Sequence, residues 1–335
     1  MSVTLHLSSA RRVLHISQPF ELLWGSRLER ATIGYERFGA EDGPIIVVQG
    51  GISADAHVAS HDDDPRPGWW DALVGPGKPI DTSRFCVIST DWLGGCGASS
   101  GPWSHGAPFP AVAPADQAAA IAAVLDSLRV ARIEAFVGAS YGGMTALAFA
   151  ERFSDRLRRA IAIGAAHRPD ARAVAWRSLQ RRMLKLSPEE APRREAMALA
   201  RALAMLTYRT RAELSARFVV TPSWDGAEAH FPIERYLEAR GEAWAQAMDP
   251  ESYRVLSQAL DLHAVEPNRI EAEVLLIGAR QDELVPIEDL WECARRIPRG
   301  KCVELDSIYG HDVFLKETAS VGALLRRALG GEAVR

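Results

Sequence analysis

Seven short apolar runs alternate with longer amphipathic stretches along this chain of 335 residues, and this alternation limits the possible folds more than any other feature. The run at 45–48 is apolar at every position, as expected of a strand buried on both faces of a sheet. The predicted strands are 31–38, 45–49, 85–89, 134–138, 159–163, 273–277 and 302–305, and the predicted helices among them are 115–128, 141–153, 286–297 and 312–329. The alternation predicts an α/β fold in which helices cover a mostly parallel central sheet.

Residues 168–267 interrupt the alternation, because they contain no good strand pattern. Helical patterns follow one another there, at 171–186, 192–206, 211–218, 233–248 and 250–260. Such an insertion between two sheet strands predicts a helical lid over the carboxyl edge of the sheet, where α/β folds place function. We therefore predict a core domain formed by 1–167 and 268–335, and a helical lid domain at 168–267.

Composition and charge exclude several classes of function. The net charge of −4 and the pI of about 6.2 argue against nucleic acid or an anionic membrane as partners. Basic residues do cluster at 152–159, 177–185 and 192–201, but apolar residues at helical spacing interrupt each cluster, so we predict solvated helix faces. No apolar stretch approaches the roughly 18 residues of a membrane helix, and the first 20 residues do not resemble a signal peptide. We expect a cytoplasmic protein without membrane association.

The cysteines give no sign of a metal or redox centre. Cys86, Cys96, Cys293 and Cys302 form no C-x-x-C pair, and such sparse use of cysteine fits a reducing compartment. We expect no metal and no permanently bound cofactor.

Residues 138–142 read Gly-Ala-Ser-Tyr-Gly, which fits the pattern G-x-S-x-G between a predicted strand and a predicted helix. A nucleophilic serine needs this order, because a tight and strained strand-to-helix turn makes its hydroxyl project. Glycines flank it because a side chain there would collide with the neighbouring strand and helix. The pattern predicts Ser140 as a nucleophile; since short motifs also arise by chance, a structural turn is the alternative.

The acid and the base of a triad are expected later in the chain, in the order serine, acid, histidine. Asp282 follows the predicted strand 273–277, and His311 follows the predicted strand 302–305. The other histidines precede the serine or fall in or beside the predicted lid, whereas Glu283, Asp289 and Asp306 compete with Asp282. We predict that His311 takes the proton of Ser140 and that Asp282 orients the imidazole.

An acyl-transfer reaction at Ser140 also needs two donors for the oxyanion. We predict the backbone N–H of Tyr141 and that of Ile52, in the loop after the strand 45–49, each worth about 3 kcal/mol of barrier.

Five further stretches make the chain resemble the homoserine O-acyltransferase family of methionine biosynthesis. They lie at 55–58, 93–102, 142–144, 206–210 and 310–315, and the similarity extends from about 30 to 320. The resemblance implies an α/β-hydrolase fold and a ping-pong transfer through an acyl-serine, from acyl-CoA as co-substrate to the hydroxyl of homoserine. It implies acetyl-CoA as the first candidate donor, succinyl-CoA as the second, and a homodimer formed through the lid.

The same resemblance implies how the amino acid is held. Arg209, in the Tyr208-Arg209 pair of the lid, would bind the carboxylate, and Asp312 would bind the amino group. This fits the chemistry of a zwitterion, which needs one fixed cation and one fixed anion. A surface arginine and a helix N-cap are the alternative roles of these two residues.

The chain also departs from the family. Tyr141 replaces the usual Met after the nucleophile, Gly50 and Gly51 replace a His-Ala pair, and the chain is somewhat shorter, apparently in the lid. We expect Tyr141 and this loop to border the acyl pocket. A serine O-acyltransferase of the same family is the nearest alternative, an esterase or thioesterase with the same triad is the next, and a non-catalytic binding protein is the last.

Overall fold

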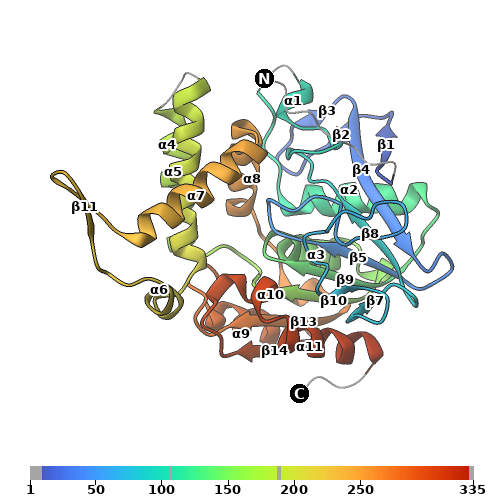
Figure 1. The fold of residues 1–335 in the computed structure, drawn as a ribbon. Coiled ribbons are helices and arrows are strands. Elements are labelled where there is room, and N and C mark those ends of the chain that lie inside the picture. The colour runs from blue at the N-terminus through green and yellow to red at the C-terminus, as the bar shows by residue number, and fades with distance from the viewer. Residues whose placement is uncertain (1–9, 106–107, 187–189, 332–335) are drawn as a thin grey trace.

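The computed structural model describes residues 10–331 except 106–107 and 187–189, and its centre is a sheet of eight strands (Figure 1). The strands are β1 Arg12–Ile16, β4 Ala31–Gly39, β8 Cys86–Thr90, β5 Ile45–Gln49, β9 Ile133–Ala139, β10 Leu157–Ile163, β13 Glu273–Ala279 and β14 Gly300–Leu305, in their order across the sheet. β4 pairs antiparallel with β1 and with β8, and every other neighbouring pair is parallel. The prediction of a mostly parallel α/β sheet is confirmed, and all seven predicted strands are present. β1 was missed because it is an exposed edge strand with an Arg and a His among its five residues.

The two faces of the sheet belong to two separate hydrophobic clusters. Val47 of β5 packs in one cluster with helices α2 Pro114–Ser127, α3 Tyr141–Arg152 and α9 Ile287–Arg296. Its neighbours Ile46 and Val48 point to the other face, into a cluster with α11 Thr318–Gly330. Because successive residues of a strand face opposite ways, a strand covered on both faces must be apolar throughout.

The last predicted helix, 312–329, is wrong as a single element. The chain forms a 3₁₀ turn η3 Gly310–Asp312, then α10 Val313–Lys316, and then α11 after a break at Glu317. The carboxylate of Glu317 accepts a hydrogen bond from the Ser307 hydroxyl at 2.9 Å, which holds the break against the loop before η3. His311 therefore lies in a short turn rather than in a long helix.

Residues 168–267, here called the lid segment, rise from one side of the sheet (Figure 1). They form α4 Ala171–Lys185, α5 Glu190–Tyr208, α6 Arg211–Arg217, α7 Pro232–Ala247 and α8 Pro250–Asp261. The segment also contains a hairpin of β11 Ser223–Asp225 and β12 Glu228–His230, so the expectation of helices alone is wrong there. The two-residue loop of this hairpin is Gly226-Ala227, and Gly226 has φ +58°. Glycine is favoured at the first position of such a loop, so the sequence did contain an indication of the hairpin.

Short elements complete the described chain: β2 Phe20–Glu21, β3 Arg27–Leu28, β6 Val74–Gly75, β7 Ile80–Asp81, α1 Pro102–His105, η1 Ser154–Arg156 and η2 Pro267–Arg269. Within the described ranges, no helix has both the length and the apolar character needed to cross a membrane.

Candidate active site

Ser140 sits at a sharp turn between β9 and α3. Its φ of 54° and ψ of −117° are unusual for a residue with a side chain, and such strain concentrates at functional sites. A Cβ on Gly138 would lie 2.0 Å from the carbonyl oxygen of Gly142, and one on Gly142 would lie 2.2 Å from that of Gln49. Both glycines are therefore required for the chain to turn this tightly and present the serine hydroxyl.

The structure brings Ser140, Asp282 and His311 together from three loops at the same edge of the sheet. His311 Nε2 lies 2.9 Å from Ser140 Oγ, and His311 Nδ1 lies 2.7 Å from Asp282 Oδ2. The other carboxylate oxygen of Asp282 accepts the backbone N–H groups of Leu284 and Val285 at 2.8 and 3.1 Å. These bonds fix the carboxylate, and the carboxylate in turn orients the imidazole.

His311 is buried, and its charge state depends on its neighbours. Burial works to lower its pKa, but the charge and hydrogen bond of Asp282 and the charge of Asp312 raise the pKa overall. A base with a raised pKa accepts the serine proton more readily.

Gly164, which follows β10, makes room for this pair, although the sequence did not single it out. It has φ +60°, and a Cβ there would lie 3.3 Å from His311 Cε1 and 3.8 Å from Asp282 Oδ2.

The loop at 50–52 lies against the serine turn. Gly142 N–H donates to the Gly50 carbonyl at 2.8 Å, and Gly51 and Ile52 line the cavity in front of Ser140. The ring of Tyr141, however, is fully buried against Trp92, and its hydroxyl accepts a hydrogen bond from Gln117 Nε2 at 3.1 Å. The expectation that its side chain borders the acyl pocket is wrong, since a residue at the first position of α3 points its side chain into the core.

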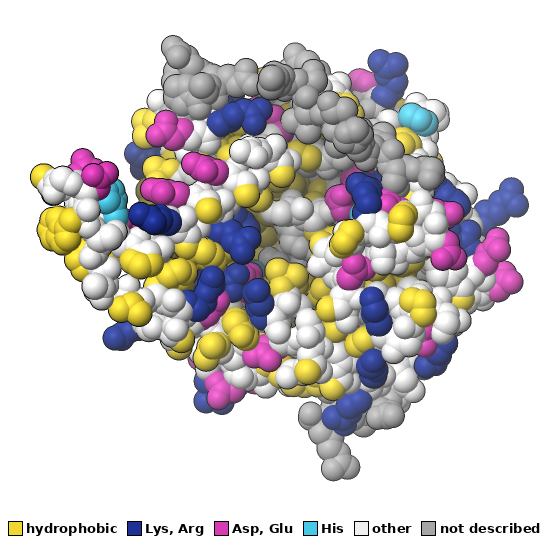
Figure 2. Space-filling view, viewed as in Figure 1, with side chains coloured by type: hydrophobic (Ala, Val, Ile, Leu, Met, Phe, Trp, Pro, Cys, Tyr) yellow, Lys and Arg dark blue, Asp and Glu magenta, His cyan; other side chains and the backbone are white. Residues whose placement is uncertain are grey.

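A cavity of about 580 Å³ separates Ser140 and His311 from the lid segment. Figure 2 shows this face hollowed at its centre, with basic side chains along the lid side of the hollow. The charged residues lining the cavity are Arg168, Asp170, Arg177, Arg201, Arg209, Arg240, Asp312 and Lys316. Six of these side chains are cationic and two are anionic, and three of the cations, Arg168, Arg177 and Arg209, also pair with carboxylates outside the lining.

Arg209 and Asp312 both line the cavity, and they contact each other. Arg209 Nη2 lies 3.0 Å from Asp312 Oδ2, while Arg209 Nη1 donates to both carboxylate oxygens of Glu213 at 2.9 and 3.1 Å. Burial raises the pKa of Asp312, and the charges of Arg209 and His311 act against that rise. Arg209 is buried, so it is not the surface arginine of the alternative interpretation; its Nε has no hydrogen-bond partner in the described part of the chain.

Tyr208, the other residue of the predicted pair, lies over the histidine. Its ring centroid is 6.0 Å from that of His311, and the guanidinium of Arg201 lies 5.2 Å from the Tyr208 ring.

Arg177, on α4, is a site residue that the sequence analysis missed. We predicted a solvated face for 177–185, but the Arg177 side chain is only 11% exposed, and its Nε donates to Asp261 at 2.6 Å. Its Nη2 is buried with no hydrogen-bond partner among the described residues, and its charge acts on His311. The sequence did indicate that Arg177 is buried, because it shares a helix face with the buried residues Ala173, Gln180 and Leu184.

Comparison with known proteins agrees with this architecture. The family model for the α/β hydrolase fold matches residues 43–318. A homoserine O-succinyltransferase of Xanthomonas campestris is 38% identical over 88% of this chain and 78% of its own length. A homoserine O-acetyltransferase of Symbiobacterium thermophilum is 35% identical over 95% of this chain and 94% of its own length. The crystal structure of homoserine O-acetyltransferase from Bacillus anthracis has a TM-score of 0.87 at 21% identity, covering 97% of this chain and 98% of that one, and it supports the fold. The chain belongs to the homoserine O-acyltransferase family, within the α/β-hydrolase superfamily.

Proposed function

We propose that this protein transfers an acyl group from acyl-CoA to the side-chain hydroxyl of a small amino acid, homoserine first and serine second. The observation that carries the proposal is the placement of one fixed cation and one fixed anion, Arg209 and Asp312, in the same cavity as the Ser140–His311–Asp282 chain of hydrogen bonds. A plain esterase has no use for a zwitterion site beside its nucleophile. With homoserine as acceptor, the product is an activated amino acid of the kind that methionine biosynthesis consumes.

In the first half-reaction, Ser140 Oγ attacks the thioester carbonyl while His311 Nε2 takes the hydroxyl proton. Asp282 stabilises the imidazolium, and the N–H groups of Tyr141 and Ile52 receive the oxyanion. The C–S bond then breaks, the CoA sulfur leaves with the proton held by His311, and the acyl group stays on Ser140 as an ester.

In the second half-reaction, the hydroxyl of the amino acid attacks the acyl-serine, and His311 takes its proton. When the C–O bond to Ser140 breaks, His311 returns the proton to the serine oxygen. Water competes at this step, so the lid segment must keep water out for transfer to exceed hydrolysis. The hydrogen bond from Trp244 Nε1 of α7 to Ser53 Oγ, 3.0 Å long, holds the lid segment against the loop beside the nucleophile.

The decisive experiment measures CoA release from acetyl-CoA and from succinyl-CoA, each with homoserine, with serine and without an amino acid. Without an amino acid we expect about one equivalent of CoA per enzyme, from acylation of Ser140, and continuous release only when an acceptor is present. Release at equal rates with and without an amino acid contradicts the transferase and favours a thioesterase.

Arg209→Ala is expected to raise the KM for the amino acid by about 100-fold or more, with a much smaller effect on the KM for acyl-CoA. The carboxylate of the acceptor loses its bidentate partner, whereas the thioester does not contact this residue. Steady-state kinetics with each substrate varied in turn provides the measurement.

Arg209→Ala also leaves Asp312 buried without its guanidinium and Glu213 paired with Arg217 alone, which destabilises the fold. Arg209→Lys is therefore needed as a second variant, because it keeps the charge and loses only the planar fork. Arg211→Ala, on the exposed side of α6, is the matched control. Unchanged amino-acid KM in both Arg209 variants contradicts the assignment.

We propose succinyl-CoA as the acyl donor, although the family resemblance implied acetyl-CoA as the first candidate. A carboxylate at the far end of the acyl chain needs a cation, and Arg177 Nη2 is a buried donor without a partner in the described structure. An acetyl group offers nothing to such a donor.

Arg177→Met is expected to lower kcat/KM for succinyl-CoA by about 10- to 100-fold while leaving acetyl-CoA turnover within a few-fold. Arg172→Met is the matched control, because Arg172 lies on the same helix with its side chain 63% exposed. Competition between the two donors in one reaction measures the preference directly. If Arg177→Met changes both donors equally, the carboxylate of the acyl chain is not held there.

We further propose that the protein is a homodimer formed through the lid segment. Large apolar side chains are exposed there, among them Val219, Val220 and Trp224 at 72, 84 and 70%. Sedimentation equilibrium at working concentrations tests this proposal, and a monomer contradicts it.

A further inference from the structure

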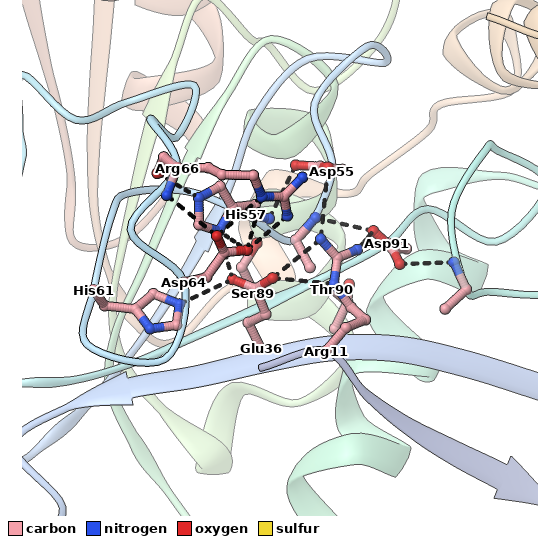
Figure 3. Close-up of polar contacts among 12 residues, drawn as sticks. Arg11, Glu36, Asp55, His57, His61, Asp64, Arg66, Ser89, Thr90 and Asp91 are labelled. Atoms are coloured by element: carbon pink, nitrogen blue, oxygen red, sulfur yellow. Dashed lines mark hydrogen bonds and ion pairs between the residues drawn. The ribbon is translucent and has the colours of Figure 1, made fainter. Parts of the chain in front are cut away.

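A buried cluster of ionisable side chains lies outside the cavity, between β4 and the segment that follows the loop at 50–52 (Figure 3). Glu36 projects from β4, and His57 and His61 come from that segment. Glu36 is completely buried, His57 is 5% exposed, and the side chain of His61 is 8% exposed. None of the three lines the cavity in front of Ser140, so the reaction proposed above does not account for them.

Their donor atoms converge on one point. Glu36 Oε2 lies 3.0 Å from His57 Nδ1 and 3.3 Å from His61 Nε2, and all three atoms lie within 4.8 Å of one another. Ligand atoms around a tetrahedral ion with bonds near 2.0–2.2 Å are separated by roughly 3.3 Å. Asp64 Oδ2 lies outside this group of three atoms, 3.6 Å from His57 Nδ1, and accepts from Arg66 Nη2 at 2.6 Å. The two distances from Glu36 Oε2 to the histidine nitrogens are thus close to those around a small metal ion.

The hydrogen bonding of His57 also has the form found in metal sites. Its Nε2 lies 2.8 Å from the carbonyl oxygen of Arg66, which only accepts, so Nε2 carries a hydrogen. In a neutral imidazole, Nδ1 then turns a lone pair toward a carboxylate oxygen 3.0 Å away, which is repulsive. A cation between the two atoms removes the repulsion. Metal-bound histidines donate their second N–H to a carbonyl in the same manner.

Charge balance points to a cation as well. The network in Figure 3 contains four carboxylates, on Glu36, Asp55, Asp64 and Asp91. Among the described residues, two guanidiniums face them: Arg11 pairs with Glu36, Asp55 and Asp91, and Arg66 pairs with Asp64. With neutral imidazoles, these described groups sum to two negative charges, and the carboxylates of Glu36, Asp64 and Asp91 are buried, which is unfavourable. One divalent cation neutralises them.

Two imidazolium groups would neutralise the network equally well, so protons compete with a metal. Burial works to lower the pKa of His57, but the Arg66 carbonyl and the Glu36 carboxylate raise it overall. The Nδ1 of His61 is buried with no hydrogen-bond partner in the described ranges, and its ring stacks on Phe38 at a centroid distance of 4.6 Å.

We propose that Glu36, His57 and His61 bind one divalent transition-metal ion. Two nitrogen donors select zinc, cobalt or nickel over magnesium and calcium, which prefer oxygen. The ion joins β4 to the segment beside the oxyanion loop and has a structural role, since it lies outside the cavity. Sequence analysis predicted no metal, because Glu36 stands 21 residues before His57 and no cysteine takes part.

The test uses the full-length, tag-free protein after treatment with a chelator at pH 7.5. Titration with Zn²⁺ by calorimetry and with Co²⁺ by visible absorption is expected to show one equivalent bound, with a ligand-field spectrum for Co²⁺ and a higher Tm with Zn²⁺. Mass spectrometry of the metal content after purification gives an independent count.

His61→Ala is expected to weaken Zn²⁺ binding by at least about 100-fold and to remove the Tm increase. Glu36→Gln serves as a second variant, because it keeps the size of the side chain while removing the charge. His230→Ala, on the exposed hairpin of the lid segment, is the control and is expected to bind Zn²⁺ as the wild type does. Absence of Co²⁺ and Zn²⁺ binding in the wild type overturns the proposal and leaves protonated histidines as the neutralising groups. Unchanged binding in His61→Ala, or loss in His230→Ala, also overturns it.

Discussion

Ser140→Ala is expected to lower kcat by about 10⁴- to 10⁶-fold while leaving the fold intact. The hydroxyl is the group that forms the ester, and no neighbouring side chain can replace it. Alanine fits the turn, because the conformation is imposed by the close approach of Gly138 and Gly142 to their neighbours and not by the serine hydroxyl. Single-turnover kinetics gives the rate, and mass spectrometry of the wild-type protein with acyl-CoA alone is expected to show one added acyl group that Ser140→Ala lacks.

The control is Ser60→Ala, since Ser60 is exposed and lies away from the hydrogen bonds of the site. An acyl adduct on Ser140→Ala, or activity within ten-fold of the wild type, would falsify the assignment of the nucleophile.

Asp282→Asn is expected to lower kcat by about 10⁴-fold, because it forces His311 into the wrong tautomer. The backbone N–H groups of Leu284 and Val285 both point at one oxygen of Asp282, so an asparagine must keep its oxygen there. Its NH₂ group then faces His311 Nδ1 and donates to it. The ring hydrogen moves to Nε2, the atom that has to accept the proton of Ser140.

¹⁵N NMR of the His311 side chain distinguishes the two tautomers and so separates this mechanism from a general loss of structure. Glu283→Gln is the matched control, because Glu283 adjoins Asp282 and is exposed. Full activity in Asp282→Asn would show that the imidazole is oriented by other groups.

The three residues with the largest expected effects could be predicted from the sequence for a topological reason. Ser140, Asp282 and His311 each follow a parallel strand, and parallel strands present their carboxyl ends at one edge of the sheet. Order along the chain therefore translates into proximity without any knowledge of side-chain packing.

Features that depend on packing between helices could not be predicted from the order of the residues along the chain. The identity of Arg209 and Asp312 as site residues was expected, but their mutual ion pair depends on how α5 approaches η3, which no local pattern encodes. The burial of Arg177 was predicted wrongly from its basic neighbours. The buried residues Ala173 and Leu184 show that Arg177 lies on the buried face of this helix. The metal site proposed at Glu36 could not be predicted from the sequence, because its donors come from a strand and a loop rather than from one motif.

The contacts between the lid segment and the two catalytic loops have a consequence for how the molecule can be divided. The Thr210 hydroxyl of the lid segment donates to the Ile308 carbonyl just before His311, and Trp244 holds Ser53 beside the oxyanion loop. The core predicted at 1–167 and 268–335 thus relies on the inserted helices to keep its reactive loops in place. A lid segment exchanged between relatives of different specificity would have to keep both of these hydrogen bonds, so the insertion cannot be transferred as an independent unit. For the same reason, heating should unfold the lid segment and the core in a single cooperative transition.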